Sequence, residues 1–289
     1  MGIRVPIPTR IGPCYPRCAP TYGQGGSGSR AHRLVSGLLG EDEVVVPNGL
    51  LNNLILYYAG NENPAVEPRL MDLHTNALHA ADNNTVTSNP GLVYPTARQY
   101  TLATSEYHSH VDNVLLRGGA EFTLACWIRF DSLPASQQYI MSKYETVGNH
   151  REYGLYYDNT SNRFEFLISY TGIAQVVPAV VANTFGAVAI NTWYLVMAWY
   201  DDALDTIYIQ INDTAADSAA LIVGTINKDV SPFHIGALGR AAAGLYVDGR
   251  IGPSMMWKSA AGAGGVLTAA QRTSLYNGGA GLPYASFTT

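Results

Sequence analysis

Charged residues are scarce in this sequence: they make up 13% of its 289 residues, about half of the quarter that is usual for globular proteins. Cysteine is scarce too, with three residues in all. Three cysteines cannot build the disulfide framework that staples small secreted domains. No apolar run approaches the ~20 residues of a membrane-spanning helix. We therefore expect neither a disulfide-dependent scaffold nor a membrane partner.

The opening residues lack the apolar core of a secretory signal, so we expect no export signal here. Cys14 and Cys18 are separated by three residues, without a histidine or a second cysteine pair nearby. Free thiols or one local disulfide explain this pair better than a zinc site does. Cys126 falls in an apolar stretch and is interpreted as a small core residue.

Apolar residues and tyrosine are what the sequence has in plenty. Hydrophobic residues make up 47% of the chain, and 19 residues are tyrosine. This is enough apolar material for a large core. Tyrosine combines a broad apolar face with a polar tip, which suits packed sheet edges, interfaces and sugar-stacking surfaces.

Residues 1–48 are predicted to form an extended arm, because proline and glycine dominate them. Residues 1–40 contain no acidic residue and carry a net charge of +5, whereas the whole chain carries −5, so residues 41–289 carry −10. A basic arm can dock on acidic neighbours, including other copies of the chain. The body has no basic stripe, so nucleic acid is not an expected partner. The arm's charges are Arg4, Arg10, Arg17, Arg30 and Arg33.

From residue 49 to residue 289 the pattern changes to short strands. The clearest is Phe122–Phe130, where every second residue is apolar. Many short strands without long helices indicate an all-β, two-sheet antiparallel sandwich. The other predicted strands are Leu51–Tyr58, Gln99–Thr104, Tyr139–Tyr144, Tyr153–Tyr157, Arg163–Thr171, Trp193–Tyr200, Thr206–Thr214, Phe233–Ile235 and Ile251–Trp257.

One short helix is predicted near the C-terminus. Thr268 and Gln271 have the spacing of a capping box, and Gly278-Gly279 supplies a stop signal after Leu275.

Several segments follow one another in a characteristic order: Asp72–Ala80, Phe122–Ile128, Trp193–Asp201, Ile207–Asp213, Phe233–Gly236, Val247–Ile251 and Leu267–Gly278. This order resembles the laminin-G-like domains of the concanavalin A-like lectin/glucanase superfamily, in the divergent branch found in bacterial surface proteins and phage virion proteins. The resemblance implies a jelly-roll β-sandwich and extends over about four-fifths of the chain.

The superfamily that the chain resembles includes glycosidases. Glycosidases of the superfamily carry two carboxylates on one strand, spaced Glu-x-Asp-x-Glu, and retaining enzymes hold the pair about 5 Å apart. That spacing does not occur, and Glu165 stands alone on its predicted strand. Nucleophile-elbow and phosphate-loop motifs do not occur either. We therefore expect a protein that is not an enzyme.

Two metal sites are conceivable, although no cofactor is required by the sequence. Oxygen ligands from Asp72, Asn76, Asp82 and Asn83 are candidates for calcium, and ordinary Asx turns are the alternative. Glu106, His108 and His110 have metal-binding side chains at alternate positions, and a polar sheet edge is the favoured interpretation.

Glycan binding needs an aromatic platform with polar flanks. Core packing and cross-strand pairing are the alternative uses of strand aromatics. The candidate glycan-facing residues are Tyr144, Tyr153, Tyr156, Tyr157 and Tyr170.

The first functional hypothesis is a non-catalytic display protein of a phage virion: a capsid decoration, head-fibre or tail component assembled in the host cytoplasm. Its arm would lie along capsid or tail proteins, and its sandwich would face outward at the virion surface. The second hypothesis is a carbohydrate-binding module of a cell-surface or secreted protein. The third is a glycan-active hydrolase.

Overall fold

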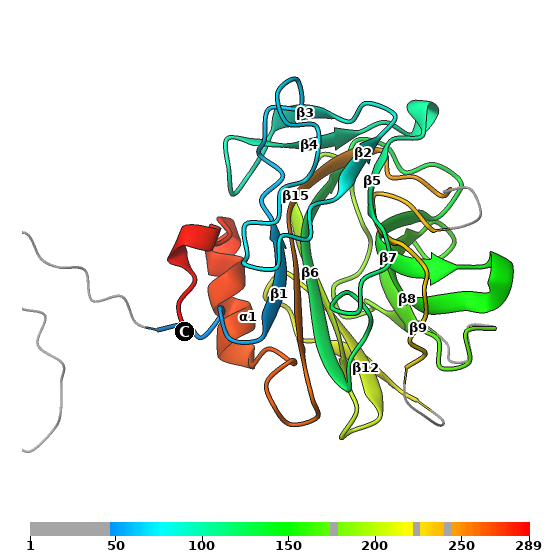
Figure 1. Cartoon of the computed structure of the whole chain (residues 1–289), viewed down its shortest axis with the longest axis vertical. Coiled ribbons are helices and arrows are strands. Elements are labelled where there is room, and N and C mark those ends of the chain that lie inside the picture. The colour runs from blue at the N-terminus through cyan, green and yellow to red at the C-terminus, as the bar shows by residue number, and fades with distance from the viewer. Residues whose placement is uncertain (1–46, 174–178, 222–225, 240–243) are drawn as a thin grey trace, which may run out of the picture. The chain divides into compact units, whose positions relative to one another are not determined.

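A computed structural model of the protein describes residues 47–173, 179–221, 226–239 and 244–289. These residues form two antiparallel sheets that pack face to face, with one short helix against the outside of the larger sheet (Figure 1). The predicted all-β jelly-roll sandwich is confirmed.

The larger, eight-stranded sheet is built around β6 (Glu121–Phe130) and β15 (Gly249–Ser259), its two longest strands. β6 pairs with β15 on one edge and with β11 on the other. β1 and β4 share the remaining edge of β15. The sheet is completed by β1 (Leu54–Tyr58), β3 (Thr87–Pro90), β4 (Thr96–Tyr100), β11 (Tyr194–Asp201), β12 (Thr206–Ile211) and β13 (Asp217–Ala220).

The smaller, seven-stranded sheet has the order β10-β9-β8-β7-β14-β5-β2. In this sheet β14 joins β5 to β7, so segments far apart in sequence become neighbours. Its strands are β2 (Ala81–Asn83), β5 (Tyr107–His110), β7 (Gln138–Glu145), β8 (His150–Asp158), β9 (Arg163–Ile168), β10 (Val180–Val181) and β14 (Phe233–Ile235).

The main core lies between the two sheets. Alternate residues of β6, from Phe122 to Phe130, are fully buried there. The Phe122 ring lies 5.3 Å from the Tyr153 ring and 6.1 Å from the Phe166 ring, measured between centroids. Aromatic pairs at such separations are stabilising beyond the area they bury.

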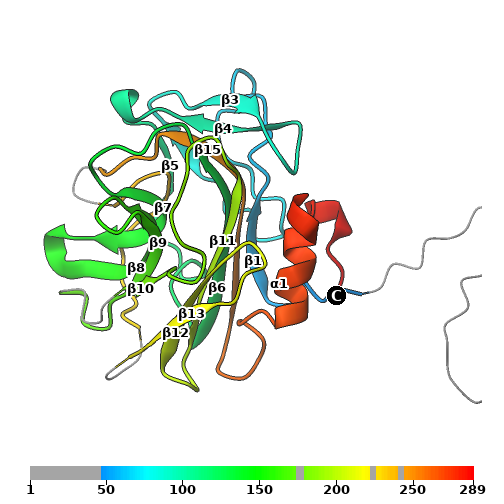
Figure 2. The same cartoon turned by 180° about the vertical axis from the view of Figure 1, so that it is seen from behind.

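A second core lies on the opposite face of β6, beneath helix α1 (Ala269–Tyr276). Trp127 stacks on Tyr276 at 6.0 Å, and the Trp257 indole donates a hydrogen bond to the Leu50 carbonyl at 2.8 Å. Helix α1 lies beside β1, on the side of the larger sheet away from β7, β8 and β9, in both views (Figures 1 and 2). The larger sheet is therefore covered on both faces. Among the described residues no helix is both long and apolar enough to cross a membrane.

The first and last described segments are joined by hydrogen bonds. The Asn48 backbone N–H donates to Thr288 Oγ1 at 2.7 Å, and its side-chain amide donates to the Ser286 carbonyl at 2.8 Å. The Leu51 N–H donates to the Thr288 carbonyl at 3.0 Å. Asn48, placed at the end of the predicted arm, thus contacts the C-terminal segment. The five arm arginines lie outside the described residues.

Most predicted strands are confirmed, with ends that shift by a few residues. The predicted strand Gln99–Thr104 is partly wrong: β4 ends at Tyr100, and a 3₁₀ turn follows over Leu102–Thr104. The Thr101 carbonyl accepts from the Thr104 N–H in that turn, which closes the chain on itself. Other 3₁₀ turns span Val147–Asn149, Asn277–Gly279 and Tyr284–Ser286.

The predicted capping box is confirmed at the start of α1. Thr268 Oγ1 accepts from the Gln271 N–H at 3.2 Å, and Gln271 Oε1 accepts from the Thr268 N–H at 2.9 Å. Changing Thr268→Ala should lower the free energy of unfolding by about 1 kcal/mol, because it leaves a helix N–H without its acceptor. Urea denaturation measures the change. Thr268→Ser keeps the hydroxyl and is the matched control; equal loss in both variants would contradict the role of the cap.

Candidate functional site

A row of mostly small side chains crosses the outer face of the seven-stranded sheet. Ser109, His234, Ser142 and Gly154 are paired in register across β5, β14, β7 and β8. A Cβ on Gly154 would lie 2.8 Å from the Tyr139 ring, so glycine at this position lets that ring lie against the sheet. Because the side chains in this row are mostly small, the connection between β14 and β15 can pack against this face.

That connection is held to the row by Ser142. Its hydroxyl donates to the Ala237 carbonyl at 2.8 Å and accepts from the Gly239 N–H at 3.4 Å. Leu238 packs with Tyr139 and Tyr144 in a separate buried cluster on this face. The middle of the outer face is therefore covered by this connection, whereas the part around β5 and β14 remains partly exposed.

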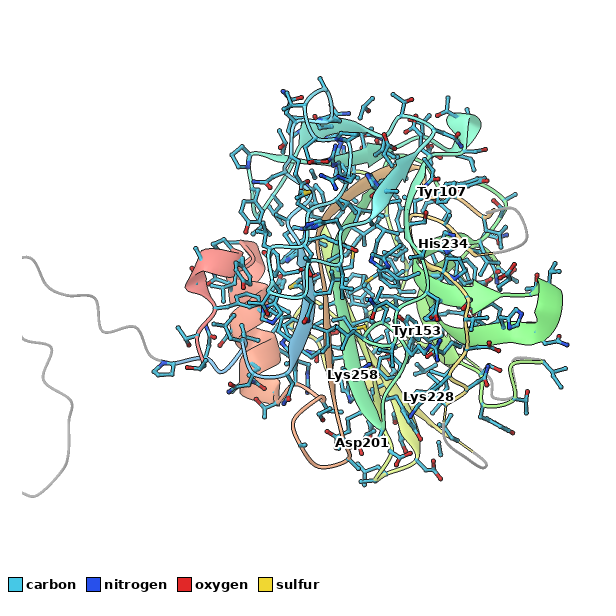
Figure 3. The ribbon with its side chains drawn as sticks, in the orientation of Figure 1. Tyr107, Tyr153, Asp201, Lys228, His234 and Lys258 are labelled. Carbon is cyan, nitrogen blue, oxygen red and sulfur yellow. The ribbon has the colours of Figure 1, made fainter. Side chains whose placement is uncertain are left out.

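An aromatic patch of three residues occupies that part: Tyr107 from β5, His234 from β14, and Tyr246 from the segment before β15. The Tyr107 ring lies 5.6 Å from the His234 ring and 6.0 Å from the Tyr246 ring, with a 36° tilt in both pairs. Tyr107 and Tyr246 are partly exposed, whereas His234 is buried beneath them. Figure 3 shows Tyr107 and His234 close together.

Tyr107 and His234 are both uncharged near neutral pH. Burial raises the pKa of the Tyr107 hydroxyl, and Tyr246 adds to this effect. Burial also lowers the pKa of His234 to about 4, against the opposing hydrogen bond with the Pro232 carbonyl. Uncharged hydrogen-bonding side chains lie beside the patch: Asn83 on β2 donates to Ser109 Oγ on β5 at 3.0 Å. Such a surface suits an uncharged, hydroxyl-rich ligand.

The five tyrosines predicted to face a glycan are divided between the two faces of the smaller sheet. Tyr153 and Tyr157 point into the core between the sheets, where they are 0% and 3% exposed, and Tyr170 packs against the same core. Tyr144 and Tyr156 lie on the outer face and are almost covered. The structure therefore does not bring the five together, because residues on β8 alternate between its faces.

On the outer face, Tyr156 is stacked on Tyr139 at 4.7 Å and donates its hydroxyl proton to Glu165 at 2.7 Å. The other Glu165 oxygen accepts from the Ser161 hydroxyl at 2.8 Å. Asp158 accepts from the N–H of Ser161 at 2.8 Å; burial opposes ionisation, but the hydrogen bonds it accepts leave its pKa lowered. These carboxylates hold the turn after β8 in place.

The candidate calcium ligand Asp72 has both carboxylate oxygens occupied by the protein itself. Its Oδ1 accepts from the N–H groups of Tyr57 and His74, and its Oδ2 accepts from the N–H of Leu78, at 2.9 to 3.0 Å. Three backbone donors on one carboxylate are the arrangement of an Asx-type loop anchor.

The other three candidate calcium ligands serve different elements. Asn76 donates to a β1 carbonyl at 2.8 Å, Asp82 accepts from the Val86 N–H at 2.9 Å, and Asn83 is bound to Ser109. Within the described ranges there is no cluster of three or more His, Cys, Asp or Glu side chains that could hold a metal ion. Calcium binding has no geometric support at these residues.

His108 faces the opposite side of β5 from the aromatic patch and is fully buried. Its Nε2 donates to the Pro68 carbonyl and its Nδ1 accepts from the Tyr100 hydroxyl, both at 3.0 Å. His110 binds a neighbouring carbonyl, and Glu106 accepts from the Thr101 N–H. The Glu106, His108, His110 pattern is therefore explained by hydrogen bonding. Cys126 is a buried free thiol, as predicted.

Two antiparallel sheets stacked face to face define a jelly-roll β-sandwich. A family model described as the concanavalin A-like lectin/glucanases superfamily, of laminin G type, matches residues 102–266. This is more than half of the chain, and the chain belongs to that superfamily. The predicted resemblance is thereby confirmed. No curated protein matches the sequence.

Solved structures share the fold at low sequence identity. Domain 4 of AbnA, an extracellular arabinanase from Geobacillus stearothermophilus in complex with arabinotriose, has a TM-score of 0.55 and 12% identity, over 77% of this chain and 97% of that one. The binding domain of Paraclostridial Mosquitocidal Protein 1 has a TM-score of 0.60 and 13% identity, over 78% and 52%.

Trypanosoma rangeli sialidase in complex with sialic acid has a TM-score of 0.55 and 14% identity, over 80% of this chain and 34% of that one. The match thus spans about half of the toxin domain and a third of the sialidase. At these identities the likeness shows the fold alone.

The sequence did not predict the aromatic patch because its best signals were local. Tyr107 is far in the chain from His234 and Tyr246, and Tyr246 lies outside any strand. The alternation in Phe233-His234-Ile235 was the one available signal, since it turns a polar residue outward from a buried strand.

Burial lowers the pKa of His108 to about 3, with Arg98 adding to the effect and the Pro68 hydrogen bond opposing it. Between pH 6.5 and 3 the folded state therefore binds fewer protons than the unfolded state, so stability falls as the pH falls. By pH 5 the loss from this residue should reach about 2 kcal/mol. His108→Gln removes the titrating group. The decrease in the free energy of unfolding between pH 7 and pH 5, measured by urea denaturation, should therefore be smaller by that amount.

His110→Gln, two residues along the same strand and partly exposed, is the matched control and should keep the steeper profile. Glu152, whose pKa burial raises to about 7, acts in the opposite sense: its stabilisation is present below pH 4.5 and is lost as the pH rises to 7. Since both variants retain Glu152, it cancels in the comparison. An unchanged profile for His108→Gln would refute the assignment.

Proposed function

We propose that residues 47–289 form a non-catalytic glycan-binding module whose binding surface is the aromatic patch of Tyr107, His234 and Tyr246. The observation that carries the proposal is the pair of partly exposed tyrosine rings, 6.0 Å apart, over a neutral histidine on an open sheet face. The apolar face of a sugar ring packs on aromatic rings, and its hydroxyls pair with neutral polar side chains.

The fold relatives support a binding role without identifying the ligand. One of them holds arabinotriose and others are named as binding domains, which makes glycans the first ligand class to test. A hydrolase is the less favoured alternative. Glu165 and Asp158, carboxylates near the outer face, are each committed to hydrogen bonds within the turn after β8, whereas a general acid would need a raised pKa.

Binding should be detectable on an array of neutral glycans that includes arabinotriose, and calorimetry should give micromolar to millimolar affinity for the best of them. Tyr107→Ala should weaken that affinity about tenfold, because it removes half of the exposed aromatic surface. Tyr246→Ala should have a similar effect.

Tyr208→Ala is the matched control. Tyr208 is a partly exposed tyrosine on β12 of the other sheet, stacked on Trp199 at 5.0 Å, and its loss should leave glycan binding unchanged. The proposal fails if no glycan binds, or if Tyr208→Ala weakens binding as much as Tyr107→Ala does.

We further propose that the arm, residues 1–48, attaches this module to a larger assembly, with the sandwich displayed outward as in a phage capsid decoration, head fibre or tail component. The supporting observation is the charge distribution: +5 on residues 1–40 against −10 on the remainder. A basic segment with many prolines loses little entropy when it docks on an acidic surface. A cell-surface or secreted carbohydrate-binding module is the alternative setting.

Deleting residues 1–40 should leave the thermal midpoint of the sandwich unchanged and abolish its incorporation into particles purified on a density gradient. Replacing the five arm arginines with glutamine in the full chain should weaken incorporation, and salt should weaken it in the wild type. Particles that contain the deletion variant at the wild-type level would exclude the arm as the attachment.

A further inference from the structure

A cavity of about 440 Å³ opens at the end of the sandwich where β6 begins and β15 ends. Its volume is within the range, about 300–1,000 Å³, of sites for small molecules. Its exposed lining is mainly apolar, with Val114, Ala120 and Ala260 among the lining residues, and Arg117, Lys228 and Lys258 border it. Figure 3 shows Lys228 and Lys258 toward the lower end of the molecule. The aromatic patch shares no residue with this cavity.

Lys258 is positioned by two backbone carbonyls. Its Nζ donates to Val114 at 2.8 Å and to Arg117 at 3.0 Å. An ammonium group carries three protons, so one proton of Lys258 has no partner among the described residues. Burial, together with the nearby cations Lys228, Arg117 and Lys143, lowers the pKa of Lys258 to about 8, against the attraction of Glu152.

Three acidic residues near the cavity are already paired with cations, and Glu121 accepts hydrogen bonds from Ser259, Gly262 and Gly265. Asp112 binds Arg117 and also lies 2.8 Å from Lys143 Nζ. Glu152, fully buried, lies 3.2 Å from Lys143 and accepts from the Gly118 N–H. Asp229 pairs with His150 at 2.9 Å.

Lys228 and Lys258 therefore stand at the cavity as cations without an acidic partner of their own among the described residues. Residues 41–289 carry a net charge of −10, so this positive charge is local. An anion bound between the two lysines would relieve the repulsion between them.

Two glycines keep the cavity open. A Cβ on Gly119 would lie 2.7 Å from Cγ of Lys258, and one on Gly118 would lie 2.7 Å from the Ile226 side chain. Larger residues at these positions would displace the aliphatic chain of Lys258 or the side chain of Ile226.

We propose that this cavity binds the carboxylate of an acidic sugar, with the sugar ring against Val114, Ala120 and Ala260 and the carboxylate between Lys258 and Lys228. One free proton on Lys258 and the exposed ammonium of Lys228 match the two oxygens of a single carboxylate. A doubly charged phosphate would require more donors. The proposal rests on the proposed glycan-binding function and gives it a second subsite for charged glycans.

The test is a titration of the full chain with glucuronate, glucose, acetate and inorganic phosphate, followed by amide chemical shifts and by calorimetry. Glucuronate should bind in the millimolar range and glucose should not bind at this cavity. Lys228→Met and Lys258→Met should each weaken glucuronate binding about tenfold, the effect of losing one charge-assisted contact. Lys228→Arg keeps the charge and should retain most of the affinity.

Three results would overturn the proposal: no binding of glucuronate, equal affinity for acetate, phosphate and glucuronate, or glucuronate binding that neither methionine variant weakens. Lys228 is exposed, so its variant remains informative if Lys258→Met fails to fold. Tyr208→Ala, at a residue of neither site, should leave glucuronate binding unchanged. Loss of neutral glycan binding in Tyr107→Ala, measured separately, judges the proposed function independently of this cavity.

Discussion

Burial of the central strands on both faces is the constraint on which the rest of this structure depends. β6 presents Phe122 and its alternate neighbours to the second sheet, and Ala125 and Trp127 to the opposite side. A single sheet could not cover both sets. The seven-stranded sheet covers the first, and α1 with the C-terminal segment covers the second. The short helix is thus a required layer of the fold.

The fold was predictable because its signals are local and periodic. Alternation in Phe122–Phe130 and the Thr268 capping box each specify structure within a few residues. The proposed binding surface was not predictable in the same way. Tyr153 and Tyr157 look like Tyr156 in the sequence, but strand alternation sends them into the core. The short strands β2 and β3 carry few apolar residues, and β10 is only two residues long, so none of them has a strong local signal.

The scarcity of charge makes the few buried charges informative. Arg98 is fully buried and donates to the carbonyls of Glu67 and Arg69, beside the carboxylate of Glu62 at 3.4 Å. Lys143, also fully buried, donates to the carbonyls of Asp229 and Ser231. Each cation thus binds the backbone of a connecting loop to the sheets. Removing either would leave buried acceptors unsatisfied, so both act as internal supports for segments that have no strand ladder of their own.

The hydrogen bonds that join Asn48 and Leu51 to Thr288 have a mechanical consequence. A pulling force applied at residue 47 would meet these few bonds first, at one corner of the domain, and would open them one after another. The strand ladders of β6 and β15 would bear load only after that corner had peeled away. A tether attached there can therefore yield by a short length under tension while both sheets, and the surfaces they carry, stay intact.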